Sequence, residues 1–272
     1  MNKRVLFLDN DNLRDLSTTV TKYSPTEYEF QYTANRDALF IGSRLPFNHV
    51  YFKIGRKNIN PAVMKVEYYS NGWNQVAEVI DETEGFTKSG FVTFVPKKSV
   101  SWQMSEESSK LEGLENSTIY DLYWLKITFD ADFDPSTGII WCGNLFSDDI
   151  YLGVEYPDLL KPAVIANFKT GKRDWEEQAV KAAEILVEDL IKKAIIDDGA
   201  QILNREDYKN ASVCKVAEII YGSFGDDFLN ERLNARKEYE QRLAKRVHKV
   251  DLNADATENV GERKTTSGWL SR

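Results

Sequence analysis

The sequence predicts an α+β protein in which an antiparallel β-sandwich module is followed by an antiparallel α-helical bundle and an extended C-terminal tail. Two changes of pattern support this order. Apolar and polar residues alternate in several short runs over 61–134, which is typical of half-buried strands. Over 135–250 the apolar residues recur every three or four positions instead, as on amphipathic helices. Residues 251–272 are polar, and by themselves are expected to lack order.

The composition limits the class of protein. The 272 residues are 42% hydrophobic and 12% aromatic, which is enough for a substantial core in one large domain or two ordinary ones. No run of about 18 apolar residues occurs, so no transmembrane helix is predicted, and the first apolar run is too short for a secretory signal. Cys142 and Cys214 are far apart and outside any C-x-x-C pattern, which favours free buried thiols in a reducing compartment.

The net charge of -8 bears on the partners. It argues against general coating of duplex DNA, because neutralising phosphates requires a basic surface. It suits either a soluble protein or one that lines a passage through which nucleic acid slides without sticking. Composition leaves these two alternatives open.

The expected elements follow in chain order. Residues 1–60 form a segment of mixed structure, with a short strand over 49–55. Within 61–134, the Asn71-Gly72 pair separates two alternating runs and supplies the positive backbone angles of a tight hairpin. A strand rich in aromatic and β-branched residues is expected over 120–132. Short strands separated by turns are typical of a small antiparallel sandwich.

The helical region begins with a short helix that Pro157 ends. Three longer amphipathic helices are predicted over residues 174–196, 206–223 and 226–247. Asp174 and Glu177 have the spacing of a capping box at the start of the first. The residues expected to face inward are Val180, Ala183, Leu186, Val187, Leu190, Ile191 and Ala194, then Val213, Val216, Ala217 and Ile220, then Leu229, Leu233 and Leu243. Short connections favour an antiparallel bundle.

No motif in the sequence supports catalysis or a resident cofactor. The stretch "DADFDPSTG" (130–138) has aspartates at alternate positions, but Pro135 and Trp141 stand where a calcium loop needs glycine and glutamate, so we predict a turn. His49 and His248 are far apart, which argues against a zinc site of the usual ligands. Carboxylates are plentiful without two of them standing out. We therefore expect no enzyme activity, no metal and no cofactor.

Two stretches resemble known protein families. "VEYYSNGWNQVAEVIDETEGFTKSGFVTFVPKKSVSW", with "YDLYWLKITF" after it, resembles a β-module common in structural proteins of tailed bacteriophages. The shared pattern consists of an aromatic strand at Tyr68, a turn before Trp at 71–73, an Asp-x-Thr-x-Gly passage within 81–90, a strand ending at Pro96, and "YWL" at 123–125. Because the module occurs in baseplate, tail and neck proteins alike, it leaves the function open.

The helical region, with "IIDDGAQILN", "KVAEIIYGSFG" and "ERLNARKEYEQRLAKRV", resembles the helix-bundle adaptor (head-completion) proteins of phage head–tail connectors over about 165–250. This resemblance implies a virion subunit located in the neck, between capsid and tail, and assembled in the host cytoplasm. The implied partners are the portal protein, copies of the chain in a ring of twelve, and other neck or tail-completion proteins, with genomic DNA passing through. The simplest adaptors are nearly all helix, whereas this chain has a large β region before its helices.

In that family a C-terminal extension reaches beyond the bundle to the portal or to neighbouring subunits. Here "GERKTTSGWLSR" would take this role, with Trp269 as an anchor. The expected portal-binding or subunit-binding residues are Arg263, Lys264, Trp269, Leu270 and Arg272 in the extension, and Arg236, Arg242 and Arg246 on the third helix. The alternative is a tail or baseplate protein whose β-module binds a carbohydrate or receptor through Tyr68, Tyr69 and Trp73. Core packing of these rings is the competing interpretation, and their exposure distinguishes the two.

Overall fold

The computed structural model describes residues 3–24, 26–107, 111–115, 117–169, 172–244, 247–257 and 262–265. It is a mixed α+β fold with antiparallel sheets, and its described residues include six α-helices, so the predicted fold class is confirmed at this level. The chain divides into two compact units. The β unit comprises Met1–Gly143 with Asp251–Thr257, and the helical unit comprises Asn144–Val250 with Glu258–Arg272. Each unit is described by itself below.

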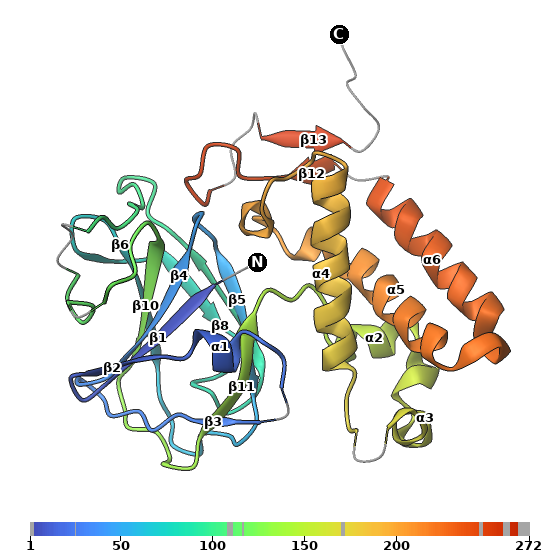
Figure 1. Ribbon diagram of the computed structural model, residues 1–272, viewed down its shortest axis with the longest axis horizontal. Helices are drawn as coiled ribbons and strands as arrows, with labels where there is room; N and C mark the ends of the chain where they lie inside the picture. The colour runs from blue at the N-terminus through green and yellow to red at the C-terminus, as the bar shows by residue number, and fades with distance from the viewer. Residues whose placement is uncertain are drawn as a thin grey trace, which may run out of the picture. The chain divides into compact units, whose positions relative to one another are not determined.

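The first sheet of the β unit has the strand order β2-β1-β4-β10-β6-β7 (Figure 1). Its strands are β1 (Arg4–Asp9), β2 (Asn12–Asp15), β4 (Ala38–Ser43), β6 (Met64–Tyr69), β7 (Trp73–Gln75) and β10 (Tyr123–Phe129). Ile127 of β10 lies opposite Leu39 of β4 on one side and Val66 of β6 on the other. All three side chains are buried, so this sheet joins segments that are distant in the sequence.

The second sheet has the order β3-β11-β5-β9-β8. Its strands are β3 (Tyr28–Glu29), β5 (His49–Ile54), β8 (Glu78–Asp81), β9 (Gly90–Val95) and β11 (Gly138–Gly143), and a short helix, α1 (Ser17–Val20), also belongs to the β unit. The strand predicted over 49–55 is β5. The first sixty residues contribute strands to both sheets, so the boundary expected at residue 60 falls inside the β unit. Similarly, β11 extends this unit beyond the boundary expected at 134.

Two turns help to position the strands and core of the β unit. The Asn71-Gly72 hairpin is present, with φ of 52° and 128° at its two residues. In the Asp-x-Thr-x-Gly passage, the Asp81 carboxylate accepts bonds from the backbone amides of Thr83 and Gly85, at 2.8 and 2.9 Å. This turn places Phe86 in the core, where its ring lies 4.9 Å from Phe52 of the second sheet and 5.2 Å from Phe129 of the first.

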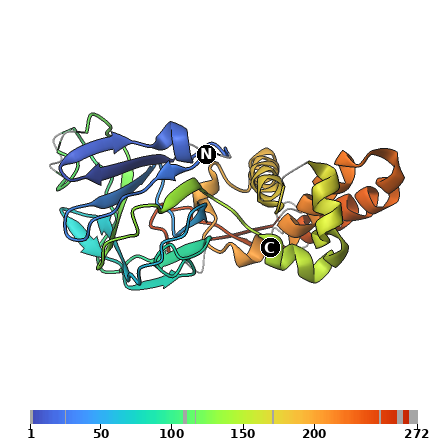
Figure 2. The same cartoon turned by 90° about the horizontal axis from the view of Figure 1, so that it is seen from below.

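The helical unit is built around α5, which contacts both α4 and α6 and lies between them in the ribbon (Figure 1). The same helices are seen from below in Figure 2. Its elements are α2 (Asp149–Glu155), α3 (Pro162–Phe168), α4 (Glu176–Lys192), α5 (Glu206–Ser223) and α6 (Leu229–Ala244), the 3-10 helices η1 (Pro157–Leu160), η2 (Gly199–Gln201) and η3 (Gly225–Phe228), and the paired strands β12 (Val247–Lys249) and β13 (Arg263–Thr265). The bounds of α5 agree with the prediction, and its four expected inward residues are buried. As expected, α2 ends just before Pro157.

The faces of α4 and α6 differ from the prediction. The N-cap of α4 is Trp175, which is fully buried and donates its indole N–H to the Leu159 carbonyl at 2.7 Å. The expected capping box with Asp174 as N-cap is therefore not observed, and the Asp174 carboxylate instead accepts from the Glu176 amide at 3.3 Å. The buried face of α4 includes small residues, and Ile191 is largely exposed. On α6, Leu229 and Leu233 are 45% and 49% exposed, whereas Leu243 is buried as predicted.

Two further predictions concern the cysteines and membrane spans. Cys142 and Cys214 are both unbridged and buried, as predicted. Among the described helices, none combines the length and apolar character that crossing a bilayer requires.

Candidate functional site

Arg236 and Arg242, two of the predicted binding residues, lie on α6 and are both engaged within the helical unit. Arg236 Nε donates to Glu218 Oε1 of α5 at 2.7 Å, and Lys215 Nζ donates to the other oxygen of Glu218 at 2.6 Å. Burial alone would raise the pKa of Glu218, but the bonds from Lys215 and Arg236 outweigh it and hold this pKa below its ordinary value. Arg236 therefore ties α6 to α5. Arg246 lies outside the described residues.

Arg242 joins three helices. Its Nη1 donates to both carboxylate oxygens of Glu155 on α2, at 2.8 and 2.6 Å, and to the Asn210 carbonyl of α5 at 3.0 Å. Its Nη2 lies 3.4 Å from Glu238 Oε2 on α6 itself. A guanidinium that holds a carboxylate through two bonds and is only one-third exposed acts as a structural tie.

The same cluster offers a candidate set of metal ligands, since atoms of Glu155, Cys214 and Glu238 lie within 4.8 Å of one another. Burial is the main cause that raises the pKa of the Cys214 thiol to about 12, so a metal ion would have to displace its proton on binding. The Tyr156 hydroxyl donates to Glu238 at 3.2 Å, and Arg242 pairs with both carboxylates. The arrangement fits an ion-pair network better than a metal centre.

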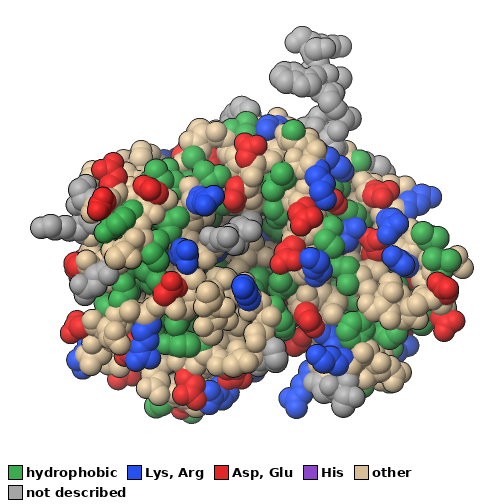
Figure 3. Space-filling view, viewed as in Figure 1, with side chains coloured by type: hydrophobic (Ala, Val, Ile, Leu, Met, Phe, Trp, Pro, Cys, Tyr) green, Lys and Arg blue, Asp and Glu red, His purple; other side chains and the backbone are tan. Residues whose placement is uncertain are grey.

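Alongside these ties, α6 keeps an apolar face exposed. Leu229 and Leu233 lie one turn apart on it, next to the half-exposed Phe228 of η3. The side chains of α6 that are buried are Ala235, Tyr239 and Leu243. On the surface over α4–α6, acidic and basic side chains alternate with apolar patches (Figure 3). Exposed apolar side chains grouped within a polar surface are typical of protein interaction sites.

The described part of the expected C-terminal extension is folded. Arg263 and Lys264 lie in β13, opposite Lys249 and His248 of β12. Arg263 is exposed, and Lys264 Nζ donates to the Ala194 carbonyl at 3.4 Å. Residues 251–257 instead form a turn in the β unit, closed by bonds to the Asp251 carboxylate. The predicted binding residues that lie outside the described part of the chain are Trp269, Leu270 and Arg272.

The predicted turn over 130–138 is present. The carboxylates of Asp130 and Asp132 each accept a bond, at 2.7 Å, from the backbone amide of a different loop. The Asp134 carboxylate accepts from the Ser136 amide at 2.8 Å, and the amide of Thr137 closes the turn on the Asp134 carbonyl at 2.9 Å. Each of the three carboxylates therefore holds a different segment of loop backbone through a hydrogen bond.

The three rings named for carbohydrate binding are packed rather than displayed as a platform. Tyr68 is fully buried, and its hydroxyl donates to the Val100 carbonyl at 2.9 Å. Tyr69 and Trp73 are partly buried and pack edge to face with centroids 6.1 Å apart. The Trp73 indole N–H donates to the Glu112 carbonyl at 3.0 Å. These contacts support the core-packing interpretation.

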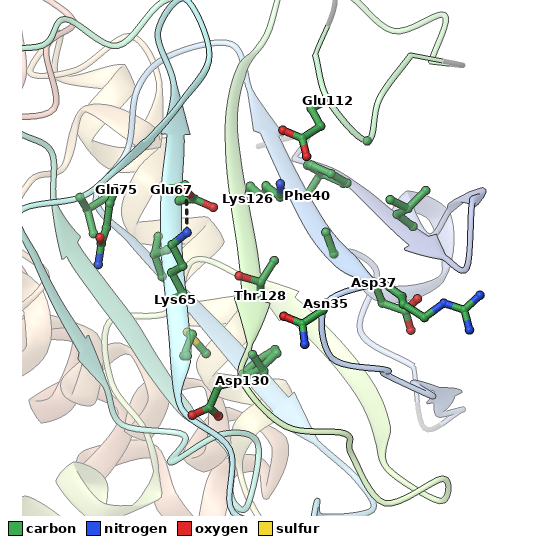
Figure 4. Close-up of a pocket in the computed structure, with 18 of the residues that line it drawn as sticks. Asn35, Asp37, Phe40, Lys65, Glu67, Gln75, Glu112, Lys126, Thr128 and Asp130 are labelled. Atoms are coloured by element: carbon green, nitrogen blue, oxygen red, sulfur yellow. Dashed lines mark ion pairs between the residues drawn. The ribbon is translucent and has the colours of Figure 1, made fainter.

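A groove of about 890 Å³ lies instead on the outer face of the first sheet (Figure 4). Its floor consists of outward-facing residues of three strands, namely Lys65 and Glu67 of β6, Gln75 of β7, and Lys126 and Thr128 of β10. The carboxylate residues around this floor are Asp11, Asp37, Glu78, Glu112, Glu115 and Asp130. The alternation in "MKVEYY" and "YWLKITF" predicts which side chains face outward, but the pairing of these two segments, which creates the groove, does not follow from it.

The floor has an ordered pattern of charge. Lys65 Nζ lies 2.9 Å from Glu67 Oε1, and Lys126 is the cross-strand partner of Glu67. Thr128 lies opposite Lys65, and Lys126 Nζ lies 5.5 Å from the Trp73 ring. Donors and acceptors therefore alternate across neighbouring strands.

No protein-family model matches this sequence, and no curated protein matches it either.

Proposed function

We propose that this chain is a structural subunit of a phage head–tail connector. In this proposal it is an adaptor that assembles as a ring beneath the portal protein, contacts other neck proteins and lines the passage of the genome. The two sheets would form the β-sandwich, α4–α6 the antiparallel bundle, and residues 251–272 the C-terminal extension. The protein would act in the virion neck after assembly in the host cytoplasm, with neither catalysis nor a cofactor. The support comes from the sequence resemblance over 165–250 and from the surface of the helical unit.

The exposed apolar face of α6 is the observation that carries this proposal. A closed ring requires each subunit to present an apolar surface that meets a different surface of the next copy. Leu229 and Leu233 provide such a surface on a helix whose buried side chains are Ala235, Tyr239 and Leu243. The net charge of -8 suits a DNA passage, because acidic walls repel phosphates and let the genome slide.

The test is the size of the particle that the purified chain forms, alone and mixed with a candidate portal protein. Mass photometry and negative-stain microscopy should show rings or portal-bound rings, and the double variant Leu229→Asp/Leu233→Asp should abolish them. Ile59→Asp provides a matched control, because this apolar side chain is also exposed but belongs to the β unit. A wild-type chain that stays monomeric with and without portal would refute the proposal.

A second test concerns the extension. Deleting 266–272 removes Trp269, Leu270 and Arg272 but retains β13 and its pairing with β12. We expect weaker docking to the portal by this truncated chain. Undiminished docking would remove these three residues from the interface.

A tail or baseplate protein with a carbohydrate-binding β-module is the second candidate. The groove on the first sheet favours it, whereas the packing of Tyr68, Tyr69 and Trp73 does not. Electron microscopy of the virion with a label on this chain distinguishes the two candidates. A label at the portal supports the connector, and a label in the tail or baseplate supports the carbohydrate-binding protein.

A further inference from the structure

We infer that the groove on the outer face of the first sheet is a binding site for a neutral oligosaccharide. All of its lining residues belong to the β unit, so the site is complete in one copy of the chain. This inference goes beyond the connector role and does not depend on ring formation.

The floor favours a ligand that both donates and accepts hydrogen bonds. Lys65 and Glu67 already neutralise each other at 2.9 Å, and Lys126 stands opposite Glu67 on the next strand. Such a floor presents strong donors and acceptors with little net charge, and Gln75 and Thr128 add an amide and a hydroxyl. Sugar hydroxyls serve as donor and acceptor at once, so a row of them satisfies both kinds of group without introducing charge.

The charges of the lining residues argue against anionic ligands. Seven carboxylate residues line the groove against three basic ones, Arg36, Lys65 and Lys126, and this excess of negative charge repels nucleic acid and sulfated or sialylated glycans. A basic peptide is the competing ligand, but the carboxylates of Asp37 and Asp130 already accept bonds from backbone amides, which leaves such a peptide fewer acidic partners. A neutral chain depends on none of these charges.

The walls also offer apolar contacts. Val63 is exposed at one side of the groove, and Leu8 and Leu13 are partly exposed at the other. The C–H face of a pyranose ring packs on aliphatic side chains of this kind. Ligand sites that combine apolar walls with a few oriented polar groups are the common form of small-ligand recognition.

The experiment uses the full-length chain on an array of neutral oligosaccharides that also carries heparin fragments and a lysine-rich peptide. We expect binding to one or more neutral glycans, which isothermal titration calorimetry then quantifies. Glu67→Ala combined with Thr128→Val should weaken that binding about tenfold or more, because each substitution removes a hydrogen-bonding group from the floor. Glu184→Ala is the matched control, since Glu184 pairs with Lys181 on α4 of the helical unit. Its affinity should stay within about twofold of the wild type.

Three outcomes would overturn the inference. The chain binds no neutral glycan on the array, it binds heparin or the basic peptide more tightly than any neutral glycan, or it binds a neutral glycan with an affinity that the floor variants leave unchanged. Circular dichroism and melting of the variants confirm that their folds are intact. Because particle size is measured separately, a chain that binds glycan without forming rings would refute the connector proposal alone.

Discussion

Glu218→Gln offers the sharpest test of how the helical unit is held together. Glu218 accepts one bond from Lys215 and one from Arg236, at 2.6 and 2.7 Å. The side chains of Glu218 and Lys215 are only 9% and 11% exposed, whereas that of Arg236 is 46% exposed. The substitution keeps the size of the side chain but leaves the buried Lys215 ammonium, which lies 4.0 Å from the Tyr239 ring, without its counter-charge.

The expected cost is about 2 kcal/mol. Removing one partner of a fully buried ion pair costs about 3–5 kcal/mol, because the other charge remains buried and unpaired. Here the part of the interaction that Arg236 contributes is discounted, since exposed ion pairs contribute about 0–1 kcal/mol. The glutamine amide also keeps one acceptor. Coupling between Glu218→Gln and Arg236→Ala should be about 1 kcal/mol in a double-mutant cycle.

The assay is urea unfolding followed by far-ultraviolet circular dichroism, which reports on the helical unit because α2–α6 belong to it. The pKa of Glu218 is lowered in the folded state, so its stabilisation is present above its ordinary value of 4.5 and is lost as pH falls below it. The difference between wild type and variant should therefore shrink on acidification. Glu240→Gln, at an exposed position of α6, is the control. A change in stability below about 0.5 kcal/mol, or additive effects in the cycle, would refute this reasoning.

Three other perturbations test separate parts of the structure. Arg242→Ala removes the tie between α2 and α6 and should cost about 1–2 kcal/mol in the same urea assay; an unchanged midpoint would contradict it. Burial raises the pKa of Cys142 and Cys214 to about 12, so both thiols should resist alkylation in the folded protein at mildly alkaline pH and react only in denaturant, as mass spectrometry can show; rapid native labelling would contradict this. Gly85→Ala should cost at least about 2 kcal/mol, since its φ is +67° and the new Cβ would collide with a backbone carbonyl, whereas Gly72→Ala, in open space, should lower the melting temperature less.

The helices show what periodicity can and cannot predict. It defined α5 well, because this helix is covered by both α4 and α6 and its four predicted inward residues are therefore all buried. On α4 it favoured large residues such as Ile191, but the buried face is lined in part by alanines, which allow close approach to a neighbour. The spacing of apolar residues predicts which face of a helix is apolar, but it does not predict how closely that face approaches the neighbouring helix.

Long-range partners could not be predicted at all. The pairing of Leu39 with Ile127 and the bond between Arg242 and Glu155 join residues that no local pattern relates. For this reason the first sixty residues could not be assigned to the sheets, and the groove could not be seen until Lys65 and Thr128 were placed side by side. The Asn71-Gly72 hairpin was predictable because its geometry is set by two adjacent residues.

These contacts shift the proposed interface on α6. Arg236 and Arg242 were expected to contact a partner, yet withdrawing Arg236 would leave the buried Glu218 with Lys215 alone, and withdrawing Arg242 would leave Glu155 unpaired between helices. Both losses weaken the contacts that position α6, so binding through these two arginines would destabilise the surface that presents them. Leu229 and Leu233 have no such conflict, because burying them against a neighbour removes apolar area from water and leaves these contacts intact. A partner of α6 is therefore expected to contact the leucine face, with the arginines retained as ties behind it.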